Sequence, residues 1–198
     1  MSGLAPLFGT ALGLAAGAGL NGYAVLLVYG GLARFFPEDF PGALDRILAG
    51  SPVLTAVGVL FVLEFLTDKV RALVHLWDVL HVVAWPLAGG LLAAAVVQPH
   101  ATMPVLVLAS GAGALTSLVA HVGKSAARVT STALTAGIAN FALSLAEDWL
   151  ALLQTLVSLF LPTVALVVVC GLYLLFLLTV PRVARTADIF GRRRRVRA

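Results

Sequence analysis

Charged residues are scarce in this sequence, and apolar residues are in excess. Asp, Glu, Lys and Arg make up 11% of the 198 residues, whereas hydrophobic residues make up 61%. A soluble domain is usually about 25% charged and about 45–50% apolar. Because so little polar surface remains, a water-soluble globule is excluded. We expect an all-α, polytopic bundle of about six transmembrane helices.

Other absences narrow the class further. No Lys or Arg precedes Arg34, so the basic start of a signal peptide is missing and we expect the first helix to be retained. The single Cys170 cannot form an intrachain disulfide and is expected to act as a small buried hydrophobe. The sequence has no P-loop, no nucleotide-binding glycine fingerprint, no Gly-x-Ser-x-Gly and no His-Glu-x-x-His. No soluble-enzyme chemistry is therefore predicted.

The basic charge is concentrated at the C-terminus. Seven of the 13 Lys and Arg residues lie within residues 181–198. Directly after an apolar helix, such a cluster indicates the cytoplasmic side and contact with anionic lipid rather than nucleic acid. We predict a multi-pass membrane protein with cytoplasmic termini whose partners are membrane lipids, anionic lipid at the tail above all, with no nucleic acid among them.

Six apolar segments can be marked off by Pro, charges and polar loops: 4–33, 52–66, 80–97, 104–122, 134–153 and 159–180. Six spans with a cytoplasmic C-terminus place the N-terminus in the cytoplasm too, and the loop charges agree. The first segment would be about 45 Å long as a straight helix, against a hydrocarbon core of about 30 Å. We therefore expect it to be tilted, broken or protruding.

The sequence also suggests an internal repeat. Residues 19–34 align with residues 113–128 at a constant offset, and each half then has a helix with two carboxylates and a helix opened by Pro. Three helices per half would make the halves inverted, as in many secondary transporters. We predict two three-helix halves, 1–98 and 99–180, followed by the basic tail 181–198.

The first segment contains two glycine patterns. Gly9, Gly13 and Gly17 form a stripe suited to close helix packing, which could also support a homodimer. The stretch Gly19-Leu20-Asn21-Gly22-Tyr23 invites a break, which the membrane tolerates only against protein or a water-filled cavity. Two interpretations stay open. Asn21 bonds a neighbouring helix, or Asn21 and Tyr23 belong to a ligand site.

Acids and histidines recur at helical spacing in the second and third segments. Glu64 and Asp68 share a helix face, as do Asp78 and His81. Acid and imidazole at this spacing can share a proton or bind a cation. They can equally belong to a helix lying at the membrane interface, with Trp85 among its anchors.

The most specific polar pattern lies in the fifth segment, where Asn140, Ser144, Glu147 and Asp148 form one stripe among apolar residues. A charged side chain at the membrane centre costs about 2.5–3.5 kcal/mol. These acids must therefore be paired, protonated, bound to cations or exposed to water. The candidate counter-charges, which could also be ordinary cytoplasmic flanking residues, are Lys69, His121, Lys124 and Arg128.

Taken in order, these motifs resemble an uncharacterised bacterial membrane family, the domain-of-unknown-function family 4126. The motifs are Gly19-Leu20-Asn21-x-Tyr23, Glu64-Phe65-x-x-Asp68-Lys69, Trp77-Asp78-x-x-His81, His121-x-x-Lys124-x-x-x-Arg128 and Asn140-x-x-x-Ser144-x-x-Glu147-Asp148. The segments after Lys69 and after Arg128 depart from the family pattern. The resemblance implies a six-helix fold in a bacterial inner membrane with a shared polar set, and it implies no activity.

Our leading hypothesis is a small transporter or channel. Glu64, Asp68, Glu147 and Asp148 would form an acidic site for a proton, metal cation or small solute. One alternative is a membrane-embedded enzyme, less favoured, in which carboxylates with His81 or His121 hold a metal. Another is a structural or assembly protein whose charges only join helices. No cofactor is predicted beyond a bound metal cation.

Overall fold

The computed structural model describes residues 3–67, 71–136 and 138–195, of which 71–79 and 180–195 are described by backbone alone. Within these ranges the chain is helical and has no strand, which confirms the predicted helical bundle. The elements are α1 (Leu4–Phe35), α2 (Ala43–Leu48), α3 (Ser51–Thr67), α4 (Arg71–Val97), the 3₁₀ turn η1 (Gln98–His100), α5 (Met103–Thr135), α6 (Asn140–Phe160) and α7 (Pro162–Arg195).

Several helix bounds differ from the prediction. α5 continues to Thr135, well beyond the predicted end at residue 122, and α6 occupies 140–160 rather than 134–153. Pro162 opens α7 as predicted, but Pro86 lies inside α4 and does not open it. Lys124 and Arg128, which follow the predicted end at residue 122, are buried on one face of α5 and do not interrupt the helix.

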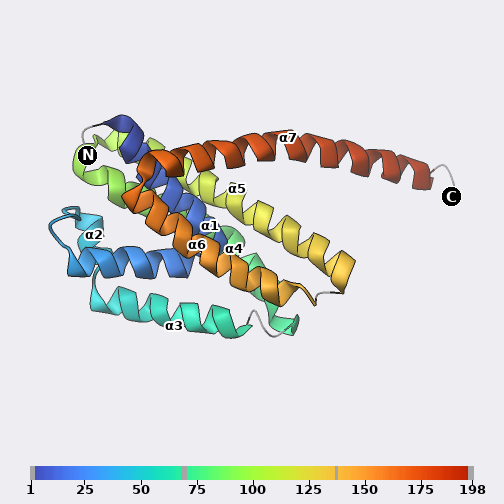
Figure 1. Ribbon diagram of the computed structural model, residues 1–198, viewed down its shortest axis with the longest axis horizontal. Helices are drawn as coiled ribbons and strands as arrows, with labels where there is room; N and C mark the ends of the chain where they lie inside the picture. The colour runs from blue at the N-terminus through green and yellow to red at the C-terminus, as the bar shows by residue number, and fades with distance from the viewer. Residues whose placement is uncertain (1–2, 68–70, 137, 196–198) are drawn as a thin grey trace.

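α1 is a broken helix that turns back on itself. Asn21 has φ −148° and ψ 96°, far from helical values. A Cβ on Gly17 would lie only 3.2 Å from Cγ2 of Val25, whereas eight residues of straight helix extend about 12 Å. Figure 1 shows two blue arms that share one end of the bundle and meet inside it. α1 therefore enters the bundle and returns without crossing it.

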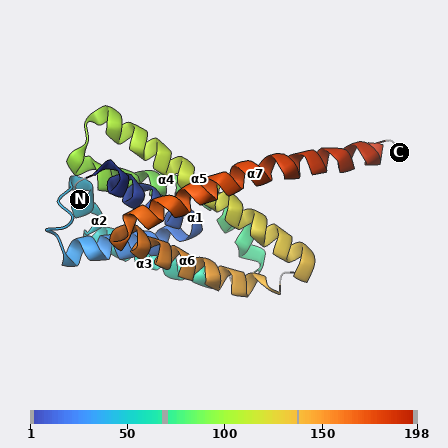
Figure 2. The same ribbon diagram turned by 45° about the horizontal axis from the view of Figure 1, so that its top comes forward.

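The reversal of α1 changes the topology. From α3 to α7 the helices run the length of the bundle in alternating directions (Figures 1 and 2). The start of α1 packs against the start of α7, because a Cβ on Gly9 would meet the backbone of Pro162. The far end of α7 consequently lies at the opposite end of the bundle from the start of α1. This differs from the predicted arrangement, in which both termini shared the cytoplasmic side.

The first arm of α1 is surrounded by other helices. A Cβ on Gly13 would meet Ser158 of α6 and Ala165 of α7, and a Cβ on Gly19 would meet the carbonyl of Ser117 in α5. The glycines of the stripe are buried in these contacts within the chain. A homodimer stays a prediction, and it would need a surface other than this stripe.

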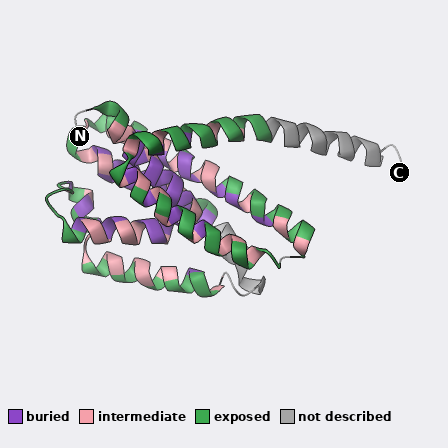
Figure 3. Cartoon of the chain, in the orientation of Figure 1, coloured by how far each residue is buried: buried purple, intermediate pink, exposed green. Residues whose placement is uncertain are grey.

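The outer helices are polar inside and apolar outside. α6 buries Glu147, Thr155 and Ser158, while Trp149 and Leu153 on its other face are 67% and 57% exposed. In Figure 3 the buried residues gather around α1, and the exposed ones cover α6 and α7. By length and composition alone, five described helices could cross a membrane, and the folded-back α1 is one of them. Cys170 on α7 is exposed, so its predicted buried role is wrong. The chain is a multi-pass membrane protein, whose apolar exterior faces lipid.

The two halves predicted from the repeat differ in backbone conformation. Residues 19–34 contain the break at Asn21. Residues 113–128, aligned with them in sequence, lie within the continuous helix α5. An inverted repeat remains a prediction, and any equivalence of the halves would have to lie in the other helices.

The folded-back α1 makes a topological prediction. If the basic tail is cytoplasmic, a short epitope tag at the N-terminus should lie on the outer side of the membrane. The same tag placed at the C-terminus should be reached by antibody only after the membrane is permeabilised. Equal accessibility of the two tags in intact spheroplasts would contradict the reversal of α1.

Two glycine substitutions should differ clearly in their effect on the free energy of unfolding. Gly19→Ala should lower the free energy of unfolding by about 1–3 kcal/mol, because its Cβ meets backbone that cannot move aside. Gly123→Ala in α5 is the matched control, since nothing lies within 4 Å of its Cβ. Its effect should be neutral or stabilising by up to about 1 kcal/mol. Denaturation in detergent measures both, and similar losses would contradict the packing described.

Candidate functional site

The break in α1 leaves backbone groups that need partners. Asn21 is 3% exposed, and its side-chain Oδ1 accepts a hydrogen bond of 3.0 Å from the backbone N–H of Ala24. This caps the second arm as an N-cap residue does. At the end of the first arm, Nζ of Lys124 donates to the carbonyl of Leu20 at 2.5 Å. A cation is favourable there, since a helix C-terminus carries partial negative charge.

Two adjacent acids of α6 face different elements around the break. Asn21 donates from Nδ2 to Oδ1 of Asp148 at 2.7 Å. Glu147 instead faces α5, where Arg128 donates to it at 2.5–3.2 Å and Nζ of Lys124 lies 3.5 Å from its Oε2. Successive helical residues differ by about 100° in direction. The pair can therefore hold α1 and α5 at once.

The ion pairs of Glu147 are buried. Glu147, Lys124 and Arg128 are 5%, 7% and 8% exposed. Removing one member of such a pair costs about 3–5 kcal/mol, because its partner is left charged in a low-dielectric interior. Lys124 has two roles, since it neutralises Glu147 and also caps the first arm of α1.

A second buried acid lies on α3. Oε1 of Glu64 on α3 is 3.7 Å from Nδ1 of His81 on α4. The His81 ring stacks on Trp85 with centroids 4.0 Å apart, and Tyr23 meets both rings edge-on at 5.7 and 4.7 Å. A Cβ on Gly22 would collide with the Trp85 ring, so glycine is required next to the break.

His81 and Trp85 are buried, at 3% and 1% exposure. The interpretation of this stretch as a helix at the membrane interface, with Trp85 as an anchor, is therefore wrong for these residues. Trp85 lies inside because α1 presents Gly22 to it, and its carbonyl accepts a 2.7 Å hydrogen bond from the Ser117 hydroxyl. Trp85 belongs to the surroundings of the break, and we had not predicted this.

The structure brings most predicted site residues together around the break. We call this set the polar centre; its members are Asn21, Tyr23, Glu64, His81, Lys124, Arg128, Glu147 and Asp148. His121 is buried on α5 one turn before Lys124, and Ser144 is half-buried on α6 one turn before Asp148. Asn140 lies apart, since it donates to Thr132 at 2.8 Å near the turn between α5 and α6.

Three predicted residues cannot be placed. Asp68 and Lys69 lie outside the described residues, and Asp78 lies on α4 where only the backbone is described. In the part of the chain that the structure describes, no three His, Cys, Asp or Glu residues lie close enough together to hold a metal ion. Glu64 and Glu147 have different partners. Glu64 lies near His81, and Glu147 pairs with the two cations of α5.

Asp148 also borders a groove between α3 and α6. The groove has a volume of about 210 Å³ and is lined by apolar side chains, among them Phe61, Phe65 and Trp149. Asp148 is half-buried, whereas its neighbour Glu147 is buried. Its carboxylate therefore lies between the break in α1 and a groove on the lipid-facing side of the bundle.

Sequence reasoning missed two features of this site. The carbonyl of Leu20 is a partner of Lys124, and backbone partners leave no trace in residue type. The contact of Gly22 with Trp85 could have been predicted in part. A helix break does not need a second glycine directly after Asn21, so this glycine indicates close packing by a bulky neighbour. Our sequence-based prediction uses this glycine only as a sign of the break.

A helix broken inside an apolar bundle and held by buried charged side chains defines a multi-pass membrane protein with a polar centre. Residues 8–182 match the family described as domain of unknown function (DUF4126), and the chain belongs to this family. The match includes the whole polar centre and ends at the start of the basic tail. No curated protein and no solved structure matches the chain.

The buried ion pairs predict a large effect of a small substitution. Glu147→Gln should lower the free energy of unfolding by about 3 kcal/mol, because Lys124 and Arg128 would both lose their countercharge. The matched control is Glu38→Gln, which removes an exposed carboxylate and should change it by less than about 0.5 kcal/mol. Equilibrium denaturation in detergent compares the two. Equal effects would show that the pairs of Glu147 do not hold the bundle.

Proposed function

We propose that this protein is a small secondary transporter or channel that moves a proton or metal cation, alone or together with a small solute. The polar centre would be its binding site. The observation that supports this most is the break of α1 at Asn21, bonded to a carboxylate that also borders a groove. Broken helices inside membranes typically line binding sites, where their freed ends meet ions and substrates.

Asp148 is the residue to which we assign cation binding. A carboxylate in a poorly solvated place is costly to keep charged, so it readily takes up a proton or a cation. Its hydrogen-bond donor Asn21 also caps the second arm of α1 through Ala24. Neutralising Asp148 would weaken the bond to Asn21 and loosen that cap. Occupancy of the site would thereby act on the arrangement of the two arms.

The other charges would have different roles. Glu147 is held by both Lys124 and Arg128, so we assign it to positioning α5 and α6 around the break. Glu64 with His81, next to Tyr23, is a second group that could exchange a proton.

A purely structural role is the second candidate, favoured by the ion pairs of Glu147. Asp148 distinguishes the two. Asp148→Asn keeps an oxygen that can accept the hydrogen bond from Asn21, and it removes the negative charge. A role limited to joining helices therefore predicts no functional consequence of this substitution, whereas a cation site requires one.

The test uses the purified full chain in liposomes. A trapped pH dye reports protons and a trapped divalent-cation dye reports Mn²⁺, each under an imposed gradient. We expect flux of at least one probe above protein-free liposomes, and Asp148→Asn should reduce it at least about tenfold, the factor that 1.4 kcal/mol represents. The matched control is Asp188→Asn, which removes one acid from the basic tail and should leave flux unchanged.

Two results would contradict the proposal. One is the absence of proton and Mn²⁺ flux above the protein-free level. The other is equal flux in the wild type and in Asp148→Asn, with both proteins folded as judged by their denaturation curves. The second result would favour the structural role.

A further inference from the structure

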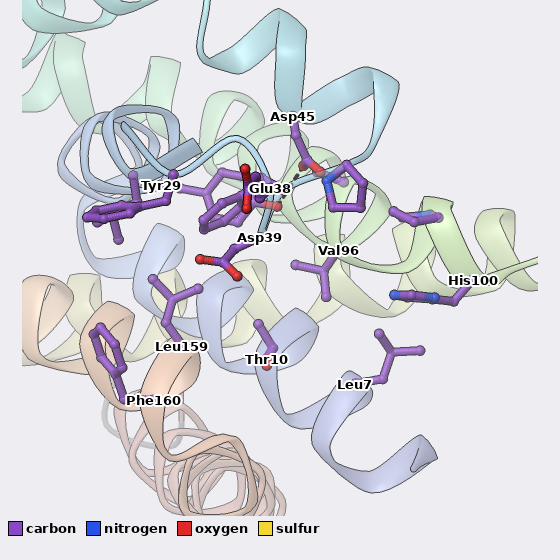
Figure 4. A pocket seen from close by; sticks show the side chains of 16 residues that line it. Leu7, Thr10, Tyr29, Glu38, Asp39, Asp45, Val96, His100, Leu159 and Phe160 are labelled. Atoms are coloured by element: carbon purple, nitrogen blue, oxygen red, sulfur yellow. Dashed lines mark hydrogen bonds between the residues drawn. The ribbon is translucent and has the colours of Figure 1, made fainter. Parts of the chain in front are cut away.

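A cavity of about 620 Å³ lies at the mouth of the folded α1, away from the polar centre. Its walls include Leu7 and Thr10 from the first arm and Tyr29 and Leu32 from the second. The segment between α1 and α2 and the connection from α4 to α5 complete it (Figure 4). Cavities of about 300–1,000 Å³ are typical of small-molecule sites. This one exists only because α1 turns back.

The cavity presents negative charge. Glu38 and Asp39, in the segment after α1, line it with exposed carboxylates. Arg34 and Arg46 do not line the cavity, and their hydrogen bonds go to backbone carbonyls and a serine hydroxyl. The basic side chain among the lining residues is His100. Neither acid forms an ion pair with any residue that the structure describes. Negative charge is thus available to a ligand.

A third carboxylate holds the cavity wall in place. Asp45 is 2% exposed and accepts hydrogen bonds of 2.8 Å from the Tyr29 hydroxyl and from the backbone N–H of Gly42. Tyr29 in turn meets Phe40 edge-on, with ring centroids 5.2 Å apart. The Tyr29 ring is therefore fixed in the wall by a buried acid. The shape of the cavity does not depend on a ligand.

Most of the remaining residues that line the cavity are aromatic or aliphatic, and few are polar. Phe36, Phe40 and Phe160 join Tyr29 around the cavity. Thr10 is 5% exposed, and its hydroxyl has no hydrogen-bond partner among the described residues. In Figure 4 it lies across from Glu38 and Asp39. A buried hydroxyl without a partner costs about 1–3 kcal/mol, so a ligand group that reached Thr10 would gain a hydrogen bond there.

We propose that this cavity binds a small organic cation, a protonated or quaternary amine with an apolar body. Aromatic rings attract ammonium groups, and carboxylates at the rim add to that attraction. The apolar walls would take the body of the ligand, and an anion would be repelled. A bare metal ion fits poorly here, since both carboxylate oxygens of Asp45 are engaged by Tyr29 and Gly42. The site does not depend on the proposed transport.

Benzyltrimethylammonium and its uncharged carbon analogue neopentylbenzene are suitable probes. Calorimetric titration of the full chain in nanodiscs should show saturable binding of the cation and much weaker binding of the analogue. The double variant Glu38→Gln/Asp39→Asn should bind the cation about tenfold more weakly, and Phe160→Ala should weaken it to a similar extent. Asp188→Asn, which removes one acid from the tail, is the control and should bind as the wild type does.

Three outcomes would overturn this proposal. They are equal affinities for the cation and its analogue, unchanged cation affinity in the double variant, and no saturable binding at millimolar concentration. Glu38 and Asp39 are exposed, so their substitution should leave the denaturation curve unchanged and any loss of binding can be assigned to the site. Because binding is measured without a gradient, absent flux in liposomes would contradict the transport proposal and leave this one standing.

Discussion

A helix can break inside an apolar bundle only if the backbone groups freed at the break find partners, and this constraint organises the whole protein. Lys124 takes the carbonyl at the end of the first arm of α1, and Asn21 takes the N–H at the start of the second. Their own partners, Glu147 and Asp148, are adjacent on α6. The need to complete the broken helix thus joins α1 to α5 and α6, which lie far from it in the sequence.

The arrangement of the bundle follows from the same constraint. α5 and α6 turn their polar faces inward because the break lies there, and their apolar faces are left to the lipid. The reversal of α1 also places both of its outer ends at one end of the bundle, so that a cavity forms between them. The polar centre therefore lies at the bend of the folded-back α1, and the cavity lies between the outer ends of its two arms.

The membrane helices and the need to pair the buried acids could be predicted from the sequence, because both follow from the free-energy cost of placing individual residues in the membrane. Long apolar runs predict membrane helices, and the cost of an embedded charge predicts that Glu64, Glu147 and Asp148 have partners. The identity of those partners depends on tertiary structure. Glu147 and Asp148 look equivalent in a stripe but face different helices. Whether α1 tilts or turns back depends on Lys124, which lies 104 residues from Leu20.

The reversal of α1 can be measured directly by a spin-label distance. Labels at Leu4 and Phe35, which are 73% and 78% exposed, would be placed in a chain whose Cys170 is replaced by alanine. In a continuous helix the two positions would be separated by about 46 Å. The folded-back helix predicts a distance distribution well short of that length in nanodiscs. A distribution centred near it would contradict the account of the break, the polar centre and the cavity together.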